Sequence, residues 1–374
     1  MDIFSEIIQK EEEKEKHLSK YACPSCSAFR VREETGDIRL SFARDIDRII
    51  HALSYTRYLD KTQVYTEIGN DNISTRMTHV QFVSRAGRTI ARALSLNEDL
   101  TEAIALGHDI GHSPFGHVGE HILNKIAKEK TGKCFAHNLN SVRVFSSLEK
   151  NGRGANLTLQ VLDGIMCHNG ELVKEKYEPV KKDYNDFLQE YEMCLQDESK
   201  IKKLRPMTLE GCIVRIADLI GYLGKDLDDA KRLGKIDMKK LPDFIQENLG
   251  CSNNEIMNSI ILDVIQESYD KPYISMSKNV YQAVYDLKAF NYENIYQFAL
   301  DESEKKECEE IFYTLYQVYE KALTNQEEEN DIYPVFLNNM TKAYLETTPL
   351  EQKVIDYLSG MTDGFIKRQY QKYR

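Results

Sequence analysis

The sequence has no apolar run that approaches the roughly 20 residues needed to cross a lipid bilayer. Its first six residues are polar and lack the pattern of a secretory signal. Acidic residues outnumber lysine and arginine, 60 to 49, so the formal net charge is -11. We therefore expect a cytoplasmic protein with no membrane partner. Nucleic acid is not expected as a partner either, although a local basic patch would leave that question open.

Cysteine is too scattered to build a zinc site of four thiolates. Eight cysteines occur in the chain, and only Cys23 and Cys26 form a CxxC pair. A structural site with four cysteines needs a second pair of this kind. We therefore expect reduced cysteines that mostly serve packing, with a redox or metal role for Cys23 and Cys26 as the alternative.

Several familiar motifs are missing as well. The chain has no GxGxxG motif after a strand, no Walker loop and no internal repeat. Sustained alternation of apolar and polar residues, which indicates strands, is absent, whereas apolar residues recur with helical spacing in most segments. An all-α fold is therefore predicted, with a multi-helix core and additional C-terminal helices.

Composition divides the predicted helices into three regions. Residues 1–40 form an N-terminal arm with a charged helical segment and the CxxC pair. Residues 41–235 are expected to form the core, and residues 236–374 a helical region packed on it. All nine histidines lie within the first 168 residues. This asymmetry places the chemistry in the first half of the chain.

The stretch 106–120 carries most of the functional argument, because it holds His108, Asp109, His112, His117 and Glu120 within fifteen residues. Imidazole nitrogens and carboxylate oxygens both bind divalent transition metals. An adjacent pair cannot close a metal site, so further ligands must come from other helices. A capped helix end is the alternative for the His-Asp doublet alone, and the three residues that follow it favour a site.

A helix predicted from about Thr78 to Leu94 carries His79 on its apolar face. Arg76 lies one turn earlier on the same side. An inward arginine beside an inward histidine suits a buried phosphate, and capping of a neighbouring helix is an equally weighted alternative. The opposite face carries three arginines that are expected to face solvent or another subunit, namely Arg85, Arg88 and Arg92.

The segment Ser95-Leu-Asn-Glu98 matches a capping box for the helix that ends at the His-Asp doublet. Glycines and a proline then predict a loop before a helix from about His117 to Lys130, on which His117 and Glu120 share a face. His137 is a candidate for the site or for the surface. His168 is interpreted as a packing or capping residue.

A long amphipathic helix is predicted from Met207 to Leu227. Steps of four residues place Asp218, Tyr222 and Asp226 in one stripe along it. An ordinary solvated face would show the same stripe. The incomplete ligand set of the His-Asp doublet favours a role for Asp218 in the site.

Taken together, an inward histidine, a His-Asp doublet and a distant helical aspartate resemble the H…HD…D pattern of the HD-domain metal-dependent phosphohydrolases. The more specific segments resemble the deoxynucleoside triphosphate triphosphohydrolases, or dGTPase family: Thr75–His79, Gly107–Glu120, Phe135–Asn138 and Asp218–Tyr222, with Lys61–Gln63 and Ser359–Asp363. The likeness runs from about residue 40 to the C-terminus.

The resemblance implies hydrolysis of a deoxynucleoside triphosphate (dNTP) to deoxynucleoside and inorganic triphosphate. It implies that a divalent transition metal (Mn, Fe, Co, Ni or Zn) is held by His79, His108, Asp109 and Asp218, with Mg possible on the nucleotide. It places His117 and Glu120 at the α-phosphate, with His112 and His137 beside them. Its implied substrate-binding residues are Arg76 at phosphate, Tyr222 under the sugar, Gln63 and Asp226 at the 3′-hydroxyl, and Arg57.

A dNTP effector and a homo-oligomer are further expectations from the resemblance. Two departures from the family pattern bear on nucleotide preference: Leu219 stands where an acid is common, and Tyr55-Thr-Arg-Tyr58 has one basic residue fewer. The alternatives are an HD enzyme acting on a nucleoside monophosphate or signalling nucleotide, and a nucleotide sensor or single-strand-binding regulator without turnover.

Overall fold

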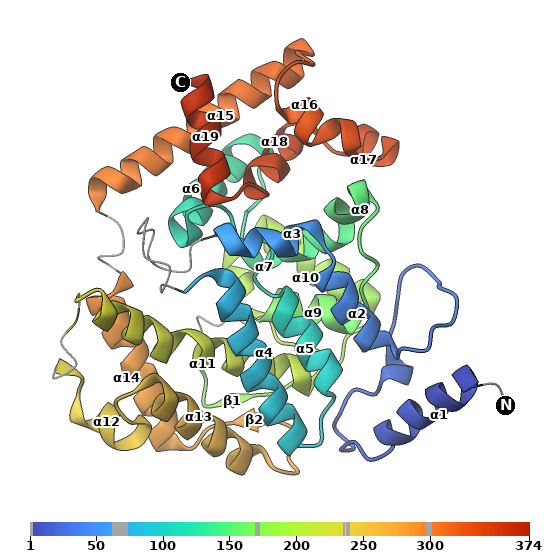
Figure 1. Cartoon of the computed structure of the whole chain (residues 1–374), viewed down its shortest axis with the longest axis vertical. Helices are drawn as coiled ribbons and strands as arrows, with labels where there is room; N and C mark the ends of the chain where they lie inside the picture. Colours follow the sequence, from blue (N-terminus) through green and yellow to red (C-terminus); the bar gives the residue numbers. More distant parts are fainter. Residues whose placement is uncertain (1–2, 62–73, 169–172, 235, 237–239, 297–300) are drawn as a thin grey trace.

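The computed structural model describes residues 3–61, 74–168, 173–234, 236, 240–296 and 301–374. Helices make up nearly all of the regular structure of these residues, which confirms the predicted all-α class (Figure 1). Two short strands, β1 (Lys176–Tyr177) and β2 (Ile274–Ser275), pair antiparallel. No helix among the described residues is both long and apolar enough to span a membrane.

The first half of the chain contributes ten helices to the described structure. They are α1 (Ile3–Glu15), α2 (Ser41–Ile50), α3 (Leu53–Thr56), α4 (Arg76–Ala93), α5 (Glu98–Gly107), α6 (Gly116–Thr131), α7 (His137–Arg143), α8 (Glu149–Gly152), α9 (Leu159–Cys167) and α10 (Tyr184–Gln196). The second half adds α11 (Leu209–Arg232), α12 (Asp243–Leu249), α13 (Asn253–Ser268), α14 (Lys278–Asn294), α15 (Glu302–Asn325), α16 (Ile332–Val335), α17 (Lys342–Thr347), α18 (Leu350–Ser359) and α19 (Asp363–Tyr373).

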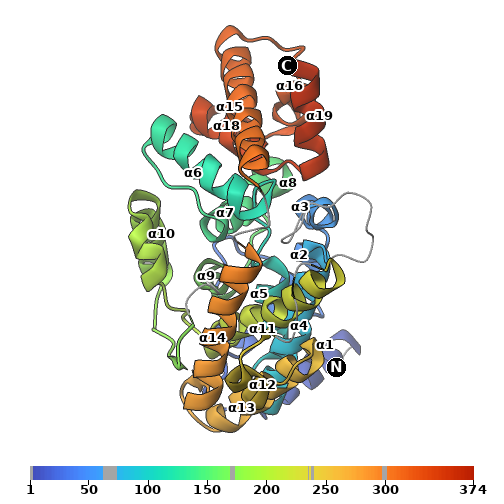
Figure 2. The same cartoon turned by 90° about the vertical axis from the view of Figure 1, so that its left-hand side faces the viewer.

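Buried apolar side chains form two clusters. The larger one joins α2, α4, α5, α9 and α11 with α12, α13 and α14. The smaller one joins α6 with α15, α18 and α19, which stand together at the top of Figure 1. Helix α6 therefore belongs to the first half of the sequence but packs with helices from the end of the chain. Figure 2 shows α10 at the outer edge of the molecule, and it contacts α7 and α9.

Helix α5 begins differently from the expectation. Its N-cap is Asn97, whose side chain accepts a hydrogen bond from the backbone N–H of Leu100. Ser95 adopts a left-handed backbone with φ 54°, outside the extended region that a capping residue normally uses. The predicted capping box at Ser95 is therefore wrong, because the chain turns two residues before the helix starts.

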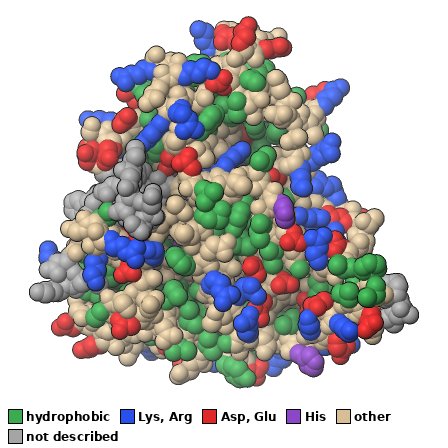
Figure 3. All heavy atoms as spheres, in the orientation of Figure 1, with side chains coloured by type: hydrophobic (Ala, Val, Ile, Leu, Met, Phe, Trp, Pro, Cys, Tyr) green, Lys and Arg blue, Asp and Glu red, His purple; other side chains and the backbone are tan. Residues whose placement is uncertain are grey.

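Two of the three arginines on the outer face of α4 are paired within the chain. Arg88 contacts Glu98 and Glu102 on α5, and Arg92 contacts Glu98. Basic and acidic side chains are interspersed over the face of the molecule drawn in Figure 3. The locally positive sequence around α4 is thus compensated by the first turn and a half of α5.

Candidate metal centre and active site

Three helices of the larger cluster bring the predicted metal ligands together. His79 lies on the buried face of α4, and His108 and Asp109 follow the last residue of α5. Asp218 lies in α11, a helix that is buried over most of its length. Gly221, one turn after Asp218, permits the close approach of α11 to α4, because a Cβ there would lie 2.8 Å from Val83 and 3.3 Å from His79.

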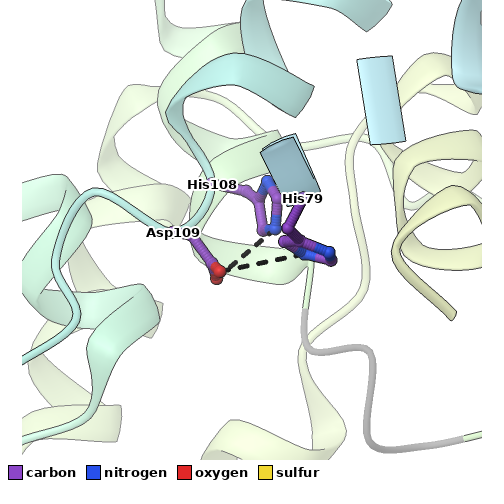
Figure 4. A group of neighbouring side chains, drawn as sticks. All are labelled: His79, His108 and Asp109. Atoms are coloured by element: carbon purple, nitrogen blue, oxygen red, sulfur yellow. Dashed lines mark ion pairs between the residues drawn. The ribbon is translucent and has the colours of Figure 1, made fainter. Parts of the chain in front are cut away.

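The four side chains converge on one point. The Nε2 atom of His79 lies 3.0 Å from Oδ1 of Asp218 and 3.8 Å from Oδ2 of Asp109. Nε2 of His108 lies 3.3 Å from Oδ1 of Asp109 and 3.6 Å from Oδ1 of Asp218. Figure 4 shows His79, His108 and Asp109 pointing toward one another. All four residues are buried.

The surroundings keep both carboxylates charged. Burial alone would raise the pKa of Asp109, but His108, His112 and Arg76 hold it well below its ordinary value. Burial opposes ionisation of Asp218 in the same way, and the neighbouring imidazoles of His108 and His79 lower its pKa. Two ionised carboxylates among histidines in a buried site favour a bound cation.

The donor set suits a divalent ion. Oxygen and nitrogen atoms of His79, His108 and Asp109 lie close enough together to hold one, and so do those of His108, His168 and Asp218. Nε2 of His108 is buried and has no hydrogen-bond partner among the described residues. A histidine nitrogen left in this state next to two carboxylates fits the ligand set of a transition metal.

Arg76 stands at the edge of this centre. Its Nη1 atom lies 2.5 Å from Oδ2 of Asp109, and the residue is 2% exposed. Its Nε atom is buried, and the described part of the chain offers it no hydrogen-bond partner. The inward orientation predicted for Arg76 is therefore present, and one side of its guanidinium group is occupied by the carboxylate.

The loop after the doublet packs tightly against α7. A Cβ atom at Gly111 would lie 2.2 Å from the backbone nitrogen of Ser141 and 2.3 Å from the carbonyl oxygen of His137. Phe115 and Gly116 then adopt left-handed conformations, with φ of 61° and 55°. This turn starts α6, where His117 lies in the first helical turn.

A chain of polar contacts leads from α6 back to the metal centre. Glu120 accepts a hydrogen bond from the backbone N–H of His137 at 2.7 Å, and its carboxylate lies 2.9 Å from Nδ1 of His137. Nδ1 of His117 lies 3.4 Å from Glu120. Nε2 of His137 lies 3.1 Å from Nε2 of His168, which is 3.9 Å from Asp109. The side chain of His117 is 68% exposed, so the series of contacts ends at the solvent.

The pKa shifts in this series of polar contacts indicate the charge of Glu120 and of His112. Burial would raise the pKa of Glu120, but His137 and His117 lower it well below its ordinary value. Burial, helped by Arg76 and His137, holds the pKa of His112 well below its ordinary value. His112 stacks on His137, with ring centroids 4.0 Å apart. Glu120 is thus a carboxylate, and His112 a neutral imidazole near neutral pH.

His168 belongs to this centre, which corrects its interpretation as a packing or capping residue. Its Nδ1 atom lies 2.6 Å from the carbonyl oxygen of Ile165, so the other ring nitrogen faces the site. Burial, with His108 and His137 nearby, lowers its pKa to about 3. The sequence offered one sign of this role. His168 stands at the end of a predicted helix and is the last of the nine histidines in the first 168 residues.

The stripe on α11 continues beyond Asp218. Asp226 is buried and accepts a hydrogen bond from the hydroxyl of Tyr296 at 2.7 Å. Burial raises the pKa of Asp226 to about 7, although the Tyr296 hydroxyl opposes the shift. Tyr222 is partly buried against the larger apolar cluster. The sequence does not single out Tyr296, since nothing in its local pattern distinguishes it from the other tyrosines.

The predicted substrate residue Arg57 lies apart from these polar contacts. Arg57 lines a cavity of about 680 Å³ between α3 and the C-terminal helices, together with Lys61 and Arg368. Lys61 is buried and its Nζ atom contacts the carbonyl oxygen of His112. Burial, with Arg57 and Arg76 nearby, lowers the pKa of Lys61 to about 7. Gln63 lies outside the described residues.

Comparison with known families matches two separate parts of the chain. The HD domain matches residues 76–222, which hold the four candidate metal ligands and the residues of α6 and α7. The phosphohydrolase-associated domain matches residues 274–372. The first match includes α4, α5 and α9 of the larger apolar cluster, and the second includes α15 and α18 of the smaller one.

Curated relatives cover nearly the whole chain. A deoxyguanosinetriphosphate triphosphohydrolase-like protein of Caldanaerobacter subterraneus subsp. tengcongensis is 38% identical over 371 residues, which is 97% of this chain and 94% of the relative. Proteins with the same description from Desulfatibacillum aliphaticivorans and Clostridium perfringens are each 36% identical, over 95% of this chain and 94% and 92% of their own lengths. The chain belongs to the HD-domain phosphohydrolases of the deoxyguanosinetriphosphate triphosphohydrolase-like family.

Proposed function

We propose that this protein hydrolyses deoxynucleoside triphosphates to deoxynucleoside and inorganic triphosphate, as a metal-dependent enzyme. The observation that carries the proposal is the contact chain that joins a buried His-Asp centre to His117 on α6 through Glu120, His137 and His168. Such a chain offers a cation site and a proton donor side by side. The names of the curated relatives support a nucleoside triphosphate as substrate.

His79, His108, Asp109 and Asp218 would hold the metal. A divalent ion bound by them would supply Lewis-acid chemistry, polarising a phosphoryl oxygen and making water a stronger nucleophile at neutral pH. Two imidazoles and two carboxylates suit Mn, Fe, Co, Ni or Zn, and we propose Mn as the first ion to assay. The ionised state of both carboxylates, maintained by their histidine and arginine neighbours, prepares the site for this ion.

His117 would donate the proton that the leaving 5′-oxygen needs. It is exposed, so a substrate oxygen can reach its free ring nitrogen, while Glu120 lies beside the other ring nitrogen. A carboxylate in this position orients the imidazole. His137 holds Glu120 from the other side, and His112 stacks on His137. We propose these two as positioning residues.

Substrate contacts would extend from the metal centre along α11. The Nε atom of Arg76, which has no hydrogen-bond partner among the described residues, would contact a phosphate oxygen. Tyr222 would pack under the sugar, and Asp226 would accept the 3′-hydroxyl, with Gln63 as its proposed partner. The hydroxyl of Tyr296 fixes one oxygen of Asp226, which leaves the other for the sugar. Arg57 would act from its cavity, at a substrate or at an effector nucleotide.

The experiment that tests this function is product analysis. Purified protein is incubated with Mn²⁺ or Mg²⁺ and each dNTP, alone and in pairs, and the products are separated by chromatography. We expect deoxynucleoside and intact triphosphate. Monophosphate with pyrophosphate would instead show that a different bond is broken, and dNTP binding without any product would favour a nucleotide sensor.

Variants assign the roles in the same assay. His117→Ala and Asp218→Ala are both expected to lose at least 100-fold in turnover, because a positioned acid alone contributes about 100 to 10,000-fold. Asp218→Ala should also lose metal, which His117→Ala should retain. His121→Ala is a matched control, since His121 is an exposed histidine on the same helix. Turnover that appears only with mixed nucleotides would support an effector, and sedimentation of the same sample tests the proposed homo-oligomer.

A further inference from the structure

A second buried polar cluster lies next to the candidate site, where α9 faces α10. It consists of Asp163 and Cys167 on α9, Lys182 just before α10, and Glu190 on α10. The Nζ atom of Lys182 lies 2.7 Å from Oδ1 of Asp163 and 2.5 Å from Oε2 of Glu190. The same Nζ lies 3.5 Å from the Sγ atom of Cys167. None of these contacts takes part in the proposed reaction.

Burial makes this lysine and cysteine a fixed pair. The side chain of Lys182 is 3% exposed, and Cys167 is 0% exposed. Asp163 is held in turn by the backbone N–H of Met207 at 2.6 Å, and the thiol of Cys167 lies 3.4 Å from the carbonyl oxygen of Arg205. A flexible lysine side chain is thereby kept beside one sulfur atom. Such constraint raises the effective concentration of one reactive group at the other.

We propose that Cys167 and Lys182 are the site of an oxidative cross-link, a covalent N–O–S bridge formed with dioxygen or a peroxide. The present distance between Sγ and Nζ leaves room for one bridging oxygen after a small approach. The cross-link is a modification site that lies outside the contact chain of the proposed function. It does not depend on that function.

The reaction with dioxygen conserves atoms and charge. The thiol of Cys167, the ammonium group of Lys182 and one O₂ give the S–O–NH bridge, one water and one proton. Sulfur and nitrogen each lose two electrons, one oxygen atom enters the bridge and the other leaves as water. The S–H bond, two N–H bonds and the O=O bond break, and S–O, O–N and two O–H bonds form. With hydrogen peroxide as the oxidant, two H₂O₂ are consumed and three waters and one proton leave. The carboxylates of Asp163 and Glu190 are in contact with Nζ and can accept the proton that it releases.

The bridge would restrain the backbone at the end of α9, next to the candidate site. Cys167 is the last residue of α9, and the next residue is His168, which lies 3.1 Å from His137. A bond from Cys167 to Lys182 would restrain the backbone that carries His168. It would also replace the cation between Asp163 and Glu190 by a neutral group. Oxidation of this cluster would therefore restrain α9 directly beside the histidine centre.

The test is mass spectrometry of the intact protein after exposure to air or dilute hydrogen peroxide, in the presence of a chelator. We expect a gain of about 14 Da, one oxygen added and two hydrogens lost, whereas a sulfenic acid adds about 16 Da. Digestion should yield one joined pair of peptides containing Cys167 and Lys182. Dithiothreitol should reverse the gain and separate the peptides.

Two variants and one internal reference complete the experiment. Lys182→Arg keeps a cation beside Asp163 and should abolish the joined peptides, as should Cys167→Ala; thermal melting reports whether each is folded. Cys212 is also fully buried, but no lysine of the described residues lies in hydrogen-bond contact with its thiol. It should therefore stay unmodified. Oxidation confined to the exposed Cys26 and Cys251, or a cysteine acid at Cys167 without joined peptides, would overturn the proposal.

Discussion

Glu210 shows how a single buried carboxylate can connect the N-terminal arm to the core. It lies in the first turn of α11 and is 0% exposed. Its Oε1 atom accepts hydrogen bonds from the backbone N–H groups of Cys23 and Asn97, each at 3.0 Å. Its Oε2 atom has no hydrogen-bond partner among the residues that the structure describes. Burial therefore dominates and raises the pKa of Glu210 from 4.5 to about 7.

This shift predicts a loss of stability as the pH rises. Below pH 4.5 the carboxyl group is protonated in both the folded and the unfolded state. Between pH 4.5 and about 7 the unfolded state releases its proton first, so the free energy of unfolding falls, by roughly 3 kcal/mol in total. Glu210→Gln keeps an acceptor for the two N–H groups and removes the titration.

We expect the stability of Glu210→Gln relative to the parent protein to improve by up to roughly 3 kcal/mol between pH 5 and pH 8. Urea unfolding of both proteins at the two pH values measures this difference. Exposed Glu293→Gln on α14 serves as a control and should show no such change. The same relative stability of Glu210→Gln at both pH values would contradict the assignment.

Among the helices, the site depends on how closely the loop after α5 approaches α7. Gly111 is the residue that permits this approach, since a methyl group on its Cα would lie 2.2 and 2.3 Å from backbone atoms of Ser141 and His137. Gly111 also donates a hydrogen bond to the hydroxyl of Ser141 at 2.9 Å. A methyl group there must displace α7, which carries His137.

Gly111→Ala is therefore expected to destabilise the fold by about 1–3 kcal/mol or more, and to lower turnover even where the protein remains folded. Gly36→Ala is the matched control, because no described residue other than its chain neighbours has an atom within 4 Å of the added carbon. That variant should stay within about 0.5 kcal/mol of the parent. Thermal unfolding and the product assay test both. Normal turnover in a folded Gly111→Ala protein would show that the position of α7 is unimportant.

Across the molecule as a whole, the two apolar clusters are joined by a buried ion pair. Arg143 at the end of α7 contacts Asp356 on α18 through Nε and Nη2, each at 2.6 Å from one carboxylate oxygen. The hydroxyl of Tyr344 donates to the same carboxylate at 2.7 Å. The side chain of Asp356 is 0% exposed. Removing Arg143 would leave the carboxylate of Asp356 buried, with only uncharged hydrogen-bond partners such as Tyr344.

Arg143→Met should lower the free energy of unfolding by about 3–5 kcal/mol. The comparison is Lys125→Met, which breaks the exposed contact between α6 and Glu309 on α15 and should cost less than about 1 kcal/mol. Denaturant unfolding measures both values. Equal effects of the two substitutions would mean that the buried pair does not hold the clusters together.

A bound metal should stabilise the folded protein. The free energy gained is about 2.7 kcal/mol when the free ion is at 100 times its dissociation constant, provided that the unfolded chain does not bind it. We expect EDTA to lower the melting temperature of the purified protein and Mn²⁺ to restore it. The melting temperature of Asp218→Ala should respond to neither. An equal response of that variant would place the stabilising ion elsewhere.

The division of the chain at residues 40 and 235 stays a proposal. Helices α12, α13 and α14 contribute to the larger apolar cluster together with α4 and α5. Helix α6 contributes to the smaller one with α15, α18 and α19. Limited proteolysis that releases residues 236–374 as a folded fragment would support the proposed boundary.

The helical class and the membership in the HD-domain family could be predicted from the amino-acid sequence alone. Both follow from local information: apolar residues with helical spacing, and the doublet at His108 and Asp109 followed by His117 and Glu120. Helical periodicity also predicted that His79 faces inward. For Asp218 it allowed a solvated face as well, and the incomplete ligand set of the doublet and the family resemblance favoured its place in the site. Both are buried beside the doublet.

Which distant residues complete the centre depended on the folded chain. His168 and Tyr296 end up beside Asp109 and Asp226 through the packing of distant segments, and their own neighbours in sequence do not show which residues they meet. The ion pair of Arg76 with Asp109 and the packing of α6 on C-terminal helices likewise arise from contacts between distant segments. Periodicity states which face of a helix is buried, whereas the partner of that face depends on the packing of the whole chain.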